Sequence, residues 1–325
     1  MSVDPQSSYS EEPEGRSEVS PMRQTLAVPI ALVKAIRPRQ APKNLFVYAA
    51  LLFTGKLLTP LPFGRVTLAF LLFTVVAGSV YLLNDLLDVE QDRQHPKKRL
   101  RPIASGALPV SVAWGAFFVF ALGGIAGGLA LNWLFGLTLS AYLVLQIAYC
   151  LKLKHIVVLD VFVVAIGFVL RTVAGGFVIE ARISHWLLLC SLQLALFLGF
   201  GKRRQELKEQ GANAEKTRAI LSDYGLPFLD QMMNLVAGVT IVCYSVYTIE
   251  SDTAKLHPHL WITVPIVIFS VCRYLYLVYQ KGWGDAPDEV LLKDRTLQVA
   301  IALWFLVIML LFKFDIAGQP LFGLG

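Results

Sequence analysis

The chain has 325 residues, 56% of them hydrophobic, and a mean hydropathy of +0.60. This composition excludes a soluble globular protein and predicts a polytopic membrane protein. The formal net charge of +6 does not indicate nucleic-acid binding, because in a membrane protein excess Lys and Arg mostly record the orientation of the loops.

The N-terminal segment, residues 1–24, is predicted to be a disordered tail. Its first 20 residues are polar and acidic, and they lack the apolar core that follows the basic end of a signal peptide. Residues 25–325 are expected to form a single transmembrane domain. A bilayer is therefore the first partner that the sequence predicts.

Nine stretches are long and apolar enough to cross a bilayer, which takes about 20 residues each. They are 44–61, 67–87, two within 109–151, 156–179, 183–201, 228–249, 260–279 and 296–312. The stretch from 109 to 151 contains no Asp, Glu, Lys or Arg, so we expect two helices joined by a tight hairpin near Asn132. The predicted fold is all-α, with nine transmembrane helices.

The loops between these nine spans differ strongly in charge. Alternate loops, among them 88–103 and 201–218, carry most of the Lys and Arg of the chain. Because positively charged loops stay in the cytoplasm, the sequence places these loops and the N-terminus there. Gly-rich patches within the spans permit close contact between helices. Association of the chain into a homo-oligomer is therefore also possible.

The four cysteines do not suggest a metal site. Each lies in or beside an apolar run, and no two have the spacing of metal ligands. We interpret them as small buried hydrophobic side chains. The five histidines are scattered as well, so the sequence predicts no zinc site.

The most informative stretch runs from Tyr81 to Gly106, where the second expected span reaches the membrane surface. Asn84, Asp88 and Asp92 are spaced i, i+4 and i+8. Asp85, Asp88 and Asp92 are spaced i, i+3 and i+7, so on a helix either set lies along one face. Carboxylates in this arrangement suit a Mg²⁺ ion that holds a diphosphate, since Mg²⁺ takes one or two carboxylates plus phosphate oxygens.

These acidic residues divide into two overlapping sets of candidates. The candidate metal ligands are Asn84, Asp88 and Asp92. The candidate catalytic residues are Asp85, Asp88 and Asp92. The alternative interpretation is a solvated helix end of mixed charge, but the position of the acids at the mouth of a membrane span argues against it.

A basic run follows the acids, and Lys and Arg neutralise phosphate charge. Its candidates for substrate binding are Arg93, Lys98 and Arg99. Lys43 adds a fourth candidate, in a Pro-containing segment that we expect to be bent or interfacial. Tyr81 lies one turn before Asp85 and is expected to stack on a sugar or contact a phosphate oxygen; the alternative is an ordinary interfacial aromatic residue.

Two charged residues lie inside the fifth expected span. Arg171 is fifteen residues into it, a depth that costs several kcal/mol unless the side chain faces a polar cavity or a partner. Asp160 lies near the same face but too far along the helix to pair with Arg171. A polar cavity open to the cytoplasm explains both, and a buried structural ion pair is the alternative. Lys154 stands at the mouth of this span.

The loop after the sixth span is basic and mixed in charge. On a helix Lys202 and Glu206 share a face, and Arg203 lies beside them. The loop is interpreted either as a lid or substrate clamp, or as a positively charged anchor on the cytoplasmic side.

The motif N-D-x-x-D-x-x-x-D, formed here by Asn84, Asp85, Asp88 and Asp92, resembles the first aspartate-rich motif of the UbiA-type intramembrane prenyltransferase superfamily. That resemblance implies nine transmembrane helices around a cytoplasm-facing polar cavity, and Mg²⁺ as the cofactor that binds a diphosphate. It also implies that residues 25–325 form a catalytic domain in the inner or plasma membrane.

Within that superfamily, the chain is most similar to the branch that transfers phosphoribose to decaprenyl phosphate. The similarity is carried by RPRQAPKN at 37–44, NDLLDVEQDRQHPKKRLRPIASG at 84–106, AYCLKLKH at 148–155, LRTVAGG at 170–176, GKRRQEL at 201–207 and KDRTLQ at 293–298. Ordinary prenyltransferases carry a second aspartate-rich motif after span six. The basic GKRRQEL stands there instead and suits another anion, such as a lipid phosphate or a 5-phosphate.

What this resemblance implies is a Mg²⁺-dependent enzyme that moves 5-phosphoribose from 5-phosphoribosyl 1-diphosphate (PRPP) to a polyprenyl phosphate, as a lipid-linked pentose for cell-envelope polysaccharide. The expected donor-binding residues are Lys43, Tyr81, Lys98 and Arg99, and Arg93 is a substrate-binding candidate beside them. The residues expected to hold the acceptor head group and the remaining phosphate are Lys154, Arg171, Lys202 and Arg203, and Glu206 is a further candidate for substrate binding.

Two alternatives remain. The first is a prenyltransferase that moves an isoprenoid from a prenyl diphosphate to an aromatic or other acceptor. The second is an anion transporter, although the chain has no convincing internal repeat of the kind common in transporters.

Overall fold

The computed structural model describes residues 21–210, 219–283, 290–291 and 293–314. Residues 1–20 of the expected tail therefore lie outside the described part, as does 211–218 in the expected lid. Within the described ranges, eight helices are long and apolar enough to cross a membrane. They are α3 (Pro60–Leu87), α5 (Val110–Leu131), α6 (Trp133–Leu151), α7 (Leu159–Val178), α8 (His185–Gln210), α10 (Leu226–Glu250), α12 (Val264–Gln280) and α14 (Arg295–Phe314).

Shorter helical elements precede, join and cap these spans. They are α1 (Pro21–Ala35), η1 (Pro38–Tyr48), α2 (Ala49–Phe53), α4 (Val89–Gln94), η2 (Lys98–Leu100), η3 (Leu153–His155), η5 (Ala219–Asp223), α11 (Asp252–Leu256) and η6 (Leu260–Thr263). The all-α polytopic fold is thus confirmed. So is the hairpin near Asn132, which separates α5 from α6 and whose side chain accepts a hydrogen bond from the Phe135 N–H at 3.1 Å.

The first expected span, 44–61, is wrong as a continuous helix. Pro38 and Pro42 lack the N–H that an α-helix needs, and η1 forms as a 3₁₀-helix before five residues of α2. Together these elements still extend about 30 Å, which is the thickness of a bilayer core. Arg37 at the start contacts Asp85 at one end of the bundle, and Phe53 accepts a hydrogen bond from Thr253 at the other. A broken ninth pass therefore joins the eight long helices.

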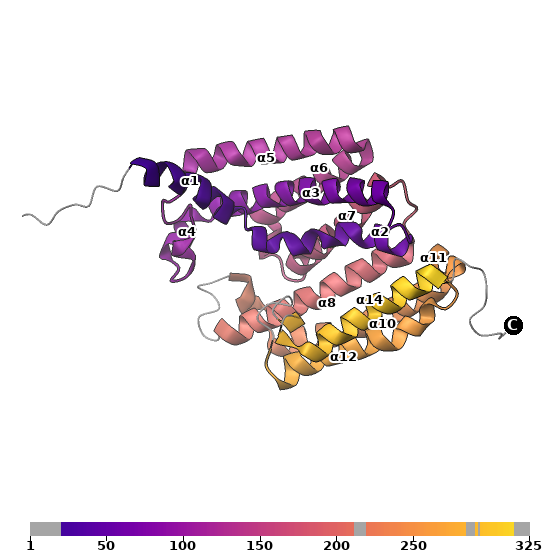
Figure 1. Ribbon diagram of the computed structural model, residues 1–325. Coiled ribbons are helices and arrows are strands. Elements are labelled where there is room, and N and C mark those ends of the chain that lie inside the picture. The colour runs from indigo at the N-terminus through magenta and orange to yellow at the C-terminus, as the bar shows by residue number, and fades with distance from the viewer. Residues whose placement is uncertain (1–20, 211–218, 284–289, 292, 315–325) are drawn as a thin grey trace, which may run out of the picture.

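The bundle has two halves that meet at α7 and α8. In Figure 1, α3, α5, α6 and α7 form one half, and α8, α10, α12 and α14 form the other. The η1–α2 pass packs on α3 and α7. The elements α4, η2, η3 and η5 gather at one end, whereas α11 lies at the opposite end. We call the first of these the α4 end.

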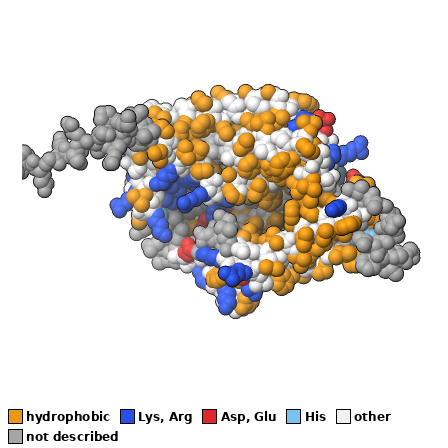
Figure 2. Space-filling model, in the orientation of Figure 1, with side chains coloured by type: hydrophobic (Ala, Val, Ile, Leu, Met, Phe, Trp, Pro, Cys, Tyr) orange, Lys and Arg blue, Asp and Glu red, His pale blue; other side chains and the backbone are white. Residues whose placement is uncertain are grey.

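The surface matches a molecule surrounded by lipid. Figure 2 shows mostly hydrophobic side chains along the length of the bundle, with Lys and Arg gathered mainly toward the α4 end. Val119 and Val144, on the outer sides of α5 and α6, are each 67% exposed, a state that an acyl-chain environment stabilises and water does not. The α4 end therefore corresponds to the membrane surface that carries the basic loops.

The η1–α2 pass can lie deep between α3 and α7 because α7 has no side chain at Gly175. A Cβ atom there would stand 1.8 Å from the backbone oxygen of Val47. Because the Val47 oxygen belongs to the backbone, no change of side-chain rotamer can make room for a Cβ atom at Gly175. Gly175 thus fixes how closely the first pass approaches the centre of the bundle.

The substitution Gly175→Ala should therefore lower the thermal midpoint of the detergent-purified protein, with a loss of about 1–3 kcal/mol of stability from overpacking. Gly115→Ala on α5 is the matched control, because nothing lies within 4 Å of a Cβ at that position. The midpoint is read from tryptophan fluorescence during heating. Equal midpoints for the two variants would contradict the close packing of η1 on α7.

Candidate functional site

The acidic motif lies where α3 ends at the α4 end of the bundle. Helix α3 ends at Leu87, and Asp88 leaves helical geometry with φ −97° and ψ 8° before α4 begins. The expected single helix is therefore interrupted. Its i→i−4 hydrogen bonds nevertheless continue, from Asp88 N–H to Asn84 O at 3.0 Å and from Asp92 N–H to Asp88 O at 2.8 Å. The four motif residues stay close together across the break.

Asp85 and Asp92 are buried, each with a side chain 2% exposed, and both contact Arg101. The Arg101 Nη1 atom lies 2.6 Å from Asp92 Oδ2 and 3.1 Å from Asp85 Oδ1. Arg37 donates a second bond to the same Asp85 oxygen at 2.5 Å. One guanidinium nitrogen thus bridges two carboxylates, at the position where a shared cation would stabilise both.

Asp88 points to a different partner. Its Oδ1 accepts a hydrogen bond from Lys154 Nζ at 2.8 Å, and Lys154 is held on η3 beside the start of α7. Asn84 is half-buried one turn earlier on α3. The three aspartates therefore face three bases from three separate parts of the chain.

This donor set fits a divalent metal in its chemistry. The second oxygen of Asp85, Oδ2, is buried and has no hydrogen-bond partner, which is costly for a carboxylate unless a cation approaches it. Hard oxygen donors of this kind are the ligands that Mg²⁺ takes. Within the described residues no three His, Cys, Asp or Glu side chains converge closely enough to form a metal site, because the acids turn to their basic partners. The set Asn84, Asp88 and Asp92 therefore remains a prediction.

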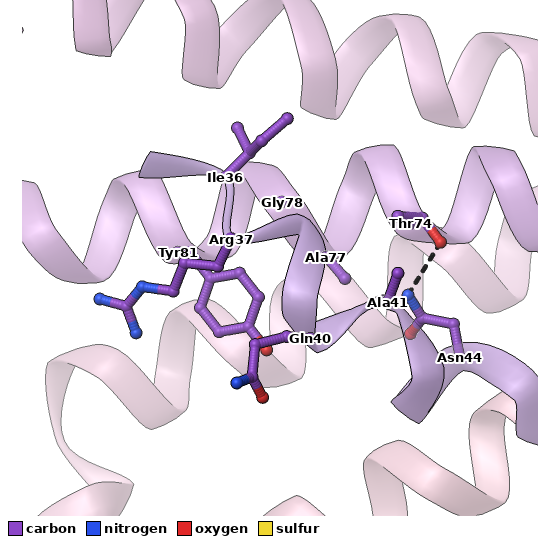
Figure 3. A pocket seen from close by; sticks show the side chains of 9 residues that line it. All are labelled: Ile36, Arg37, Gln40, Ala41, Asn44, Thr74, Ala77, Gly78 and Tyr81. Atoms are coloured by element: carbon purple, nitrogen blue, oxygen red, sulfur yellow. Dashed lines mark hydrogen bonds between the residues drawn. The ribbon is translucent and has the colours of Figure 1, made fainter. Parts of the chain in front are cut away.

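A small cavity of about 10 Å³ lies beside this cluster, between η1 and α3, with room for about one water. Figure 3 shows Tyr81 and Arg37 side by side at its wall, with the Asn44 and Thr74 side chains joined by a hydrogen bond farther along α3. The Arg37 guanidinium carbon lies 5.1 Å from the centre of the Tyr81 ring. Arg37 itself adopts a left-handed backbone with φ 54°, which is uncommon outside glycine and often occurs at functional sites.

Arg171 lies deeper in the bundle and is 7% exposed. Its guanidinium donates to Asn44 Oδ1 at 2.8 Å, to the Gly167 carbonyl at 2.7 Å and to the Tyr142 hydroxyl at 3.1 Å. It also stands 4.9 Å from the centre of the Phe73 ring. Within the described part of the chain these polar partners are neutral, so the charge of Arg171 has no carboxylate in contact with it.

Asp160, in contrast, has a strong ionic partner, and that partner is Arg203 on α8. The Arg203 Nε atom lies 2.6 Å from Asp160 Oδ2, and both side chains are almost fully buried. The Tyr224 hydroxyl donates to Asp160 Oδ1 at 2.7 Å and accepts from the Val158 N–H at 2.6 Å. Burial, followed by the bond to Asp160, raises the pKa of Tyr224, so this hydroxyl stays protonated. The network ties α7, α8 and the segment before α10 together.

Beside this network, α8 extends beyond the expected end of span six and carries Lys202 and Glu206 at the α4 end. Their side chains pair at 3.8 Å, as the i, i+4 spacing predicts. Arg203 also contacts Glu206, at 2.5 Å. Lys202 is 44% exposed, and of the two basic residues it is the one whose side chain reaches solvent.

The remaining basic candidates surround the acidic motif. Arg93 is half-exposed and pairs with Glu90 at 2.8 Å, Arg99 is exposed, and Lys43 and Lys98 are half-buried. The turn that carries them is organised by His95, whose Nδ1 accepts the N–H groups of Lys97 and Lys98. Partial burial and then the nearby Lys98 lower the pKa of His95, which keeps Nδ1 free to accept these bonds.

Four site residues were not among the candidates from sequence: Arg37, Asn44, Arg101 and Tyr142. Arg37, Asn44 and Arg101 lie inside the motifs that carry the family resemblance, and these motifs are the sequence signal that marks them. Tyr142 lies in an apolar span without a local motif, and only its contact with Arg171 marks it.

Comparisons with known proteins identify a family model and named relatives. Residues 44–213 match the model of the UbiA prenyltransferase family. The chain is 35% identical over 287 residues to the decaprenyl-phosphate phosphoribosyltransferase of Mycolicibacterium smegmatis, covering 84% of this chain and 89% of that protein. It is 34% identical over 278 residues to the protein of the same name from Mycobacterium tuberculosis, covering 84% and 91%.

Solved structures show the same fold. A UbiA homolog from Archaeoglobus fulgidus bound to DMAPP and Mg²⁺ superposes with a TM-score of 0.66 at 18% identity, covering 89% of this chain and all of that one. The same homolog bound to GPP and Mg²⁺ gives 0.66, covering 88% of this chain and 99% of that one. At this identity the likeness establishes the fold and nothing finer.

The buried Asp160–Arg203 pair yields a test of what Arg203 does. Arg203→Met leaves the Asp160 carboxylate buried without its ionic partner, so stability should fall by about 3–5 kcal/mol. Lys255→Gln removes the exposed pair with Asp252 at the opposite end and should cost less than about 1 kcal/mol. Thermal midpoints in detergent measure both. An unchanged midpoint for Arg203→Met, with weaker substrate binding, would show instead that Arg203 is a substrate ligand.

Proposed function

The chain belongs to the UbiA prenyltransferase family of membrane enzymes, and from this premise we propose that it transfers 5-phosphoribose from PRPP to a polyprenyl phosphate and releases diphosphate. The observation that carries the proposal is the similarity to decaprenyl-phosphate phosphoribosyltransferases, which extends over nearly their whole length. The product would be a lipid-linked pentose for cell-envelope polysaccharide.

The donor diphosphate would bind at the α4 end. Asp85, Asp88 and Asp92, together with Asn84, would hold a divalent metal, for which we propose Mg²⁺. When bound, the metal supplies Lewis acidity that stabilises the departing diphosphate. The Mg²⁺ in the A. fulgidus structures supports this choice of ion.

Basic side chains around the aspartates would bind the phosphate oxygens of the donor. Arg37, Arg101 and Lys154 contact the acids directly, so they are the nearest cations to a diphosphate at this position. Lys43, Arg93, Lys98 and Arg99 lie farther out and would add to the attraction. The contact of Lys154 with Asp88 favours a role on the donor side rather than on the acceptor side.

In the reaction, the bond between C1 of the ribose and the diphosphate oxygen breaks as a bond forms between C1 and an oxygen of the lipid phosphate. C1 develops oxocarbenium character, and the electron pair of the broken bond leaves with the diphosphate. Because the acceptor phosphate is already an anion, no strong general base is needed. Tyr81 would position the sugar, since its ring contacts Arg37 one turn before Asp85.

The 5-phosphate of the donor and the phosphate of the lipid would bind to basic side chains that do not contact the three aspartates. Arg171 has only neutral partners within the described residues, and a buried unpaired charge favours an anionic ligand. Lys202 at the mouth of α8 is the second candidate. For Arg203 the pair with Asp160 supports a positioning role, in which it holds Glu206 and its neighbour Lys202 in place.

The site would face the cytoplasm, and the protein would be a multi-pass protein of the plasma membrane with a cytoplasmic N-terminus. The Lys- and Arg-rich elements at the α4 end support this orientation. The soluble donor would then reach the aspartates from the cytoplasm, while the lipid tail lies along the apolar helices.

The proposal predicts that purified protein in nanodiscs, given labelled PRPP, decaprenyl phosphate and Mg²⁺, forms a labelled lipid. Asp88→Asn should lower the rate about 100-fold or more, because one group that stabilises the transition state is lost. Asp252→Asn is the control, since Asp252 is 77% exposed at the opposite end. Consumption of prenyl diphosphates without PRPP would favour prenyl transfer, the alternative that the family as a whole supports.

Removal of divalent metal should abolish the same activity. With excess EDTA the labelled lipid should fall to background, and restored Mg²⁺ should return the rate to its starting value. The reaction is followed by thin-layer chromatography of the lipid fraction. Full activity in EDTA would remove the metal from the mechanism and leave the bases alone to neutralise the diphosphate.

A further inference from the structure

Each aspartate of the motif is paired with a base in the structure. Asp85 contacts Arg37 and Arg101, Asp92 contacts Arg101, and Asp88 contacts Lys154, all at 2.5–3.1 Å. Three acids face three bases, so these six side chains together are electrically neutral. This set is called the ion-pair cluster below.

Arg37 and Arg101 approach Asp85 and Asp92 from the open side. The side chains of Asp85 and Asp92 are 2% exposed, whereas those of Arg37 and Arg101 are 30% and 26% exposed. The two arginines can therefore swing outward without any rearrangement of the buried acids, whereas Lys154, with a side chain 14% exposed, is more buried than its partner Asp88 at 23%. The buried acids, held by α3 and α4, have no such freedom.

Arg101 occupies the place between two carboxylates at which a metal would neutralise both. A divalent metal that displaced it would leave the bases unpaired and the cluster with two excess positive charges, which a partly buried site resists. If the metal arrives with a diphosphate, the released bases gain phosphate oxygens as new partners, and such charge-assisted bonds are strong. The ion-pair cluster should therefore bind a divalent metal more tightly when diphosphate is present than when the metal is alone.

From this arrangement we infer that Arg37 and Arg101 are exchangeable counter-ions: they hold the two buried aspartates before the donor binds and move to the donor diphosphate when it binds, so that metal and diphosphate bind cooperatively. The free Oδ2 of Asp85 supports the inference, because one buried ligand atom faces no competing base. The inference rests on the proposed diphosphate site, but it holds for any diphosphate donor and does not require that the sugar be ribose.

The test measures metal binding and requires no turnover. Protein in nanodiscs is dialysed to equilibrium against Mn²⁺, used in place of Mg²⁺, with and without inorganic diphosphate, and empty nanodiscs are subtracted. At equal free Mn²⁺, diphosphate should raise the affinity of the wild-type protein about 10-fold or more, within the usual range of coupling between sites. Equal affinity with and without diphosphate would overturn the inference, and this comparison needs no variant.

A substitution tests the role of the bases themselves. Arg101→Gln should tighten the binding of Mn²⁺ alone about 10-fold, because a competing cation is gone, and should reduce the effect of diphosphate. Arg65→Gln is the matched control: it removes the same charge from the looser pair with Glu180, at 3.8 Å near the other end of α3, and should change neither quantity. Unchanged or weaker Mn²⁺ binding in Arg101→Gln would contradict the exchange. Labelled-lipid formation from PRPP can fail while this coupling persists, so the two proposals fail separately.

Discussion

The salt bridges of Asp85 and Asp92 with Arg101 hold together the end of the bundle on which the proposed chemistry depends. They join the end of α3 to α4 and to the chain that follows η2, beside the apolar contacts that Leu86 and Ile103 make in the core. Arg37 adds the start of the first pass to the same cluster. Because the acids are buried, loss of a base would leave a charge without solvent or partner, and that cost keeps the four segments together.

Two other polar centres lie within the apolar bundle, and they differ in how their charges are balanced. Asp160 and Arg203 neutralise each other, and Tyr224 completes the hydrogen bonds of the carboxylate. Arg171, in contrast, is surrounded by amide, hydroxyl and carbonyl oxygens and aromatic faces. The charges of the first centre are satisfied within the protein, which favours a structural role for it. The second retains a net positive charge that an anionic substrate can complement.

The cluster and the first pass also depend on each other. The η1–α2 pass reaches the centre of the bundle because Gly175 leaves room for the backbone of Val47, and this depth places Asn44 against Arg171 and Arg37 against Asp85. A regular α-helix of the same residues would be shorter by about 0.5 Å per residue and would present these side chains on another face. The 3₁₀ geometry imposed by the prolines is thus part of the site.

Hydropathy alone determined the class of the protein, its all-α fold, the α5–α6 hairpin and the limits of most spans, because the energy of placing apolar segments in lipid is local to each segment. The spacing of Asn84, Asp85, Asp88 and Asp92 likewise marked the candidate site, since i→i−4 neighbours are set by the helix itself. The sequence missed the break of the first pass, the contacts of Arg101 with two aspartates and the pairing of Asp160 with Arg203. The two ion-pair contacts join residues 9 positions apart (Asp92 and Arg101) and 43 positions apart (Asp160 and Arg203), and only the tertiary packing decides which charges meet.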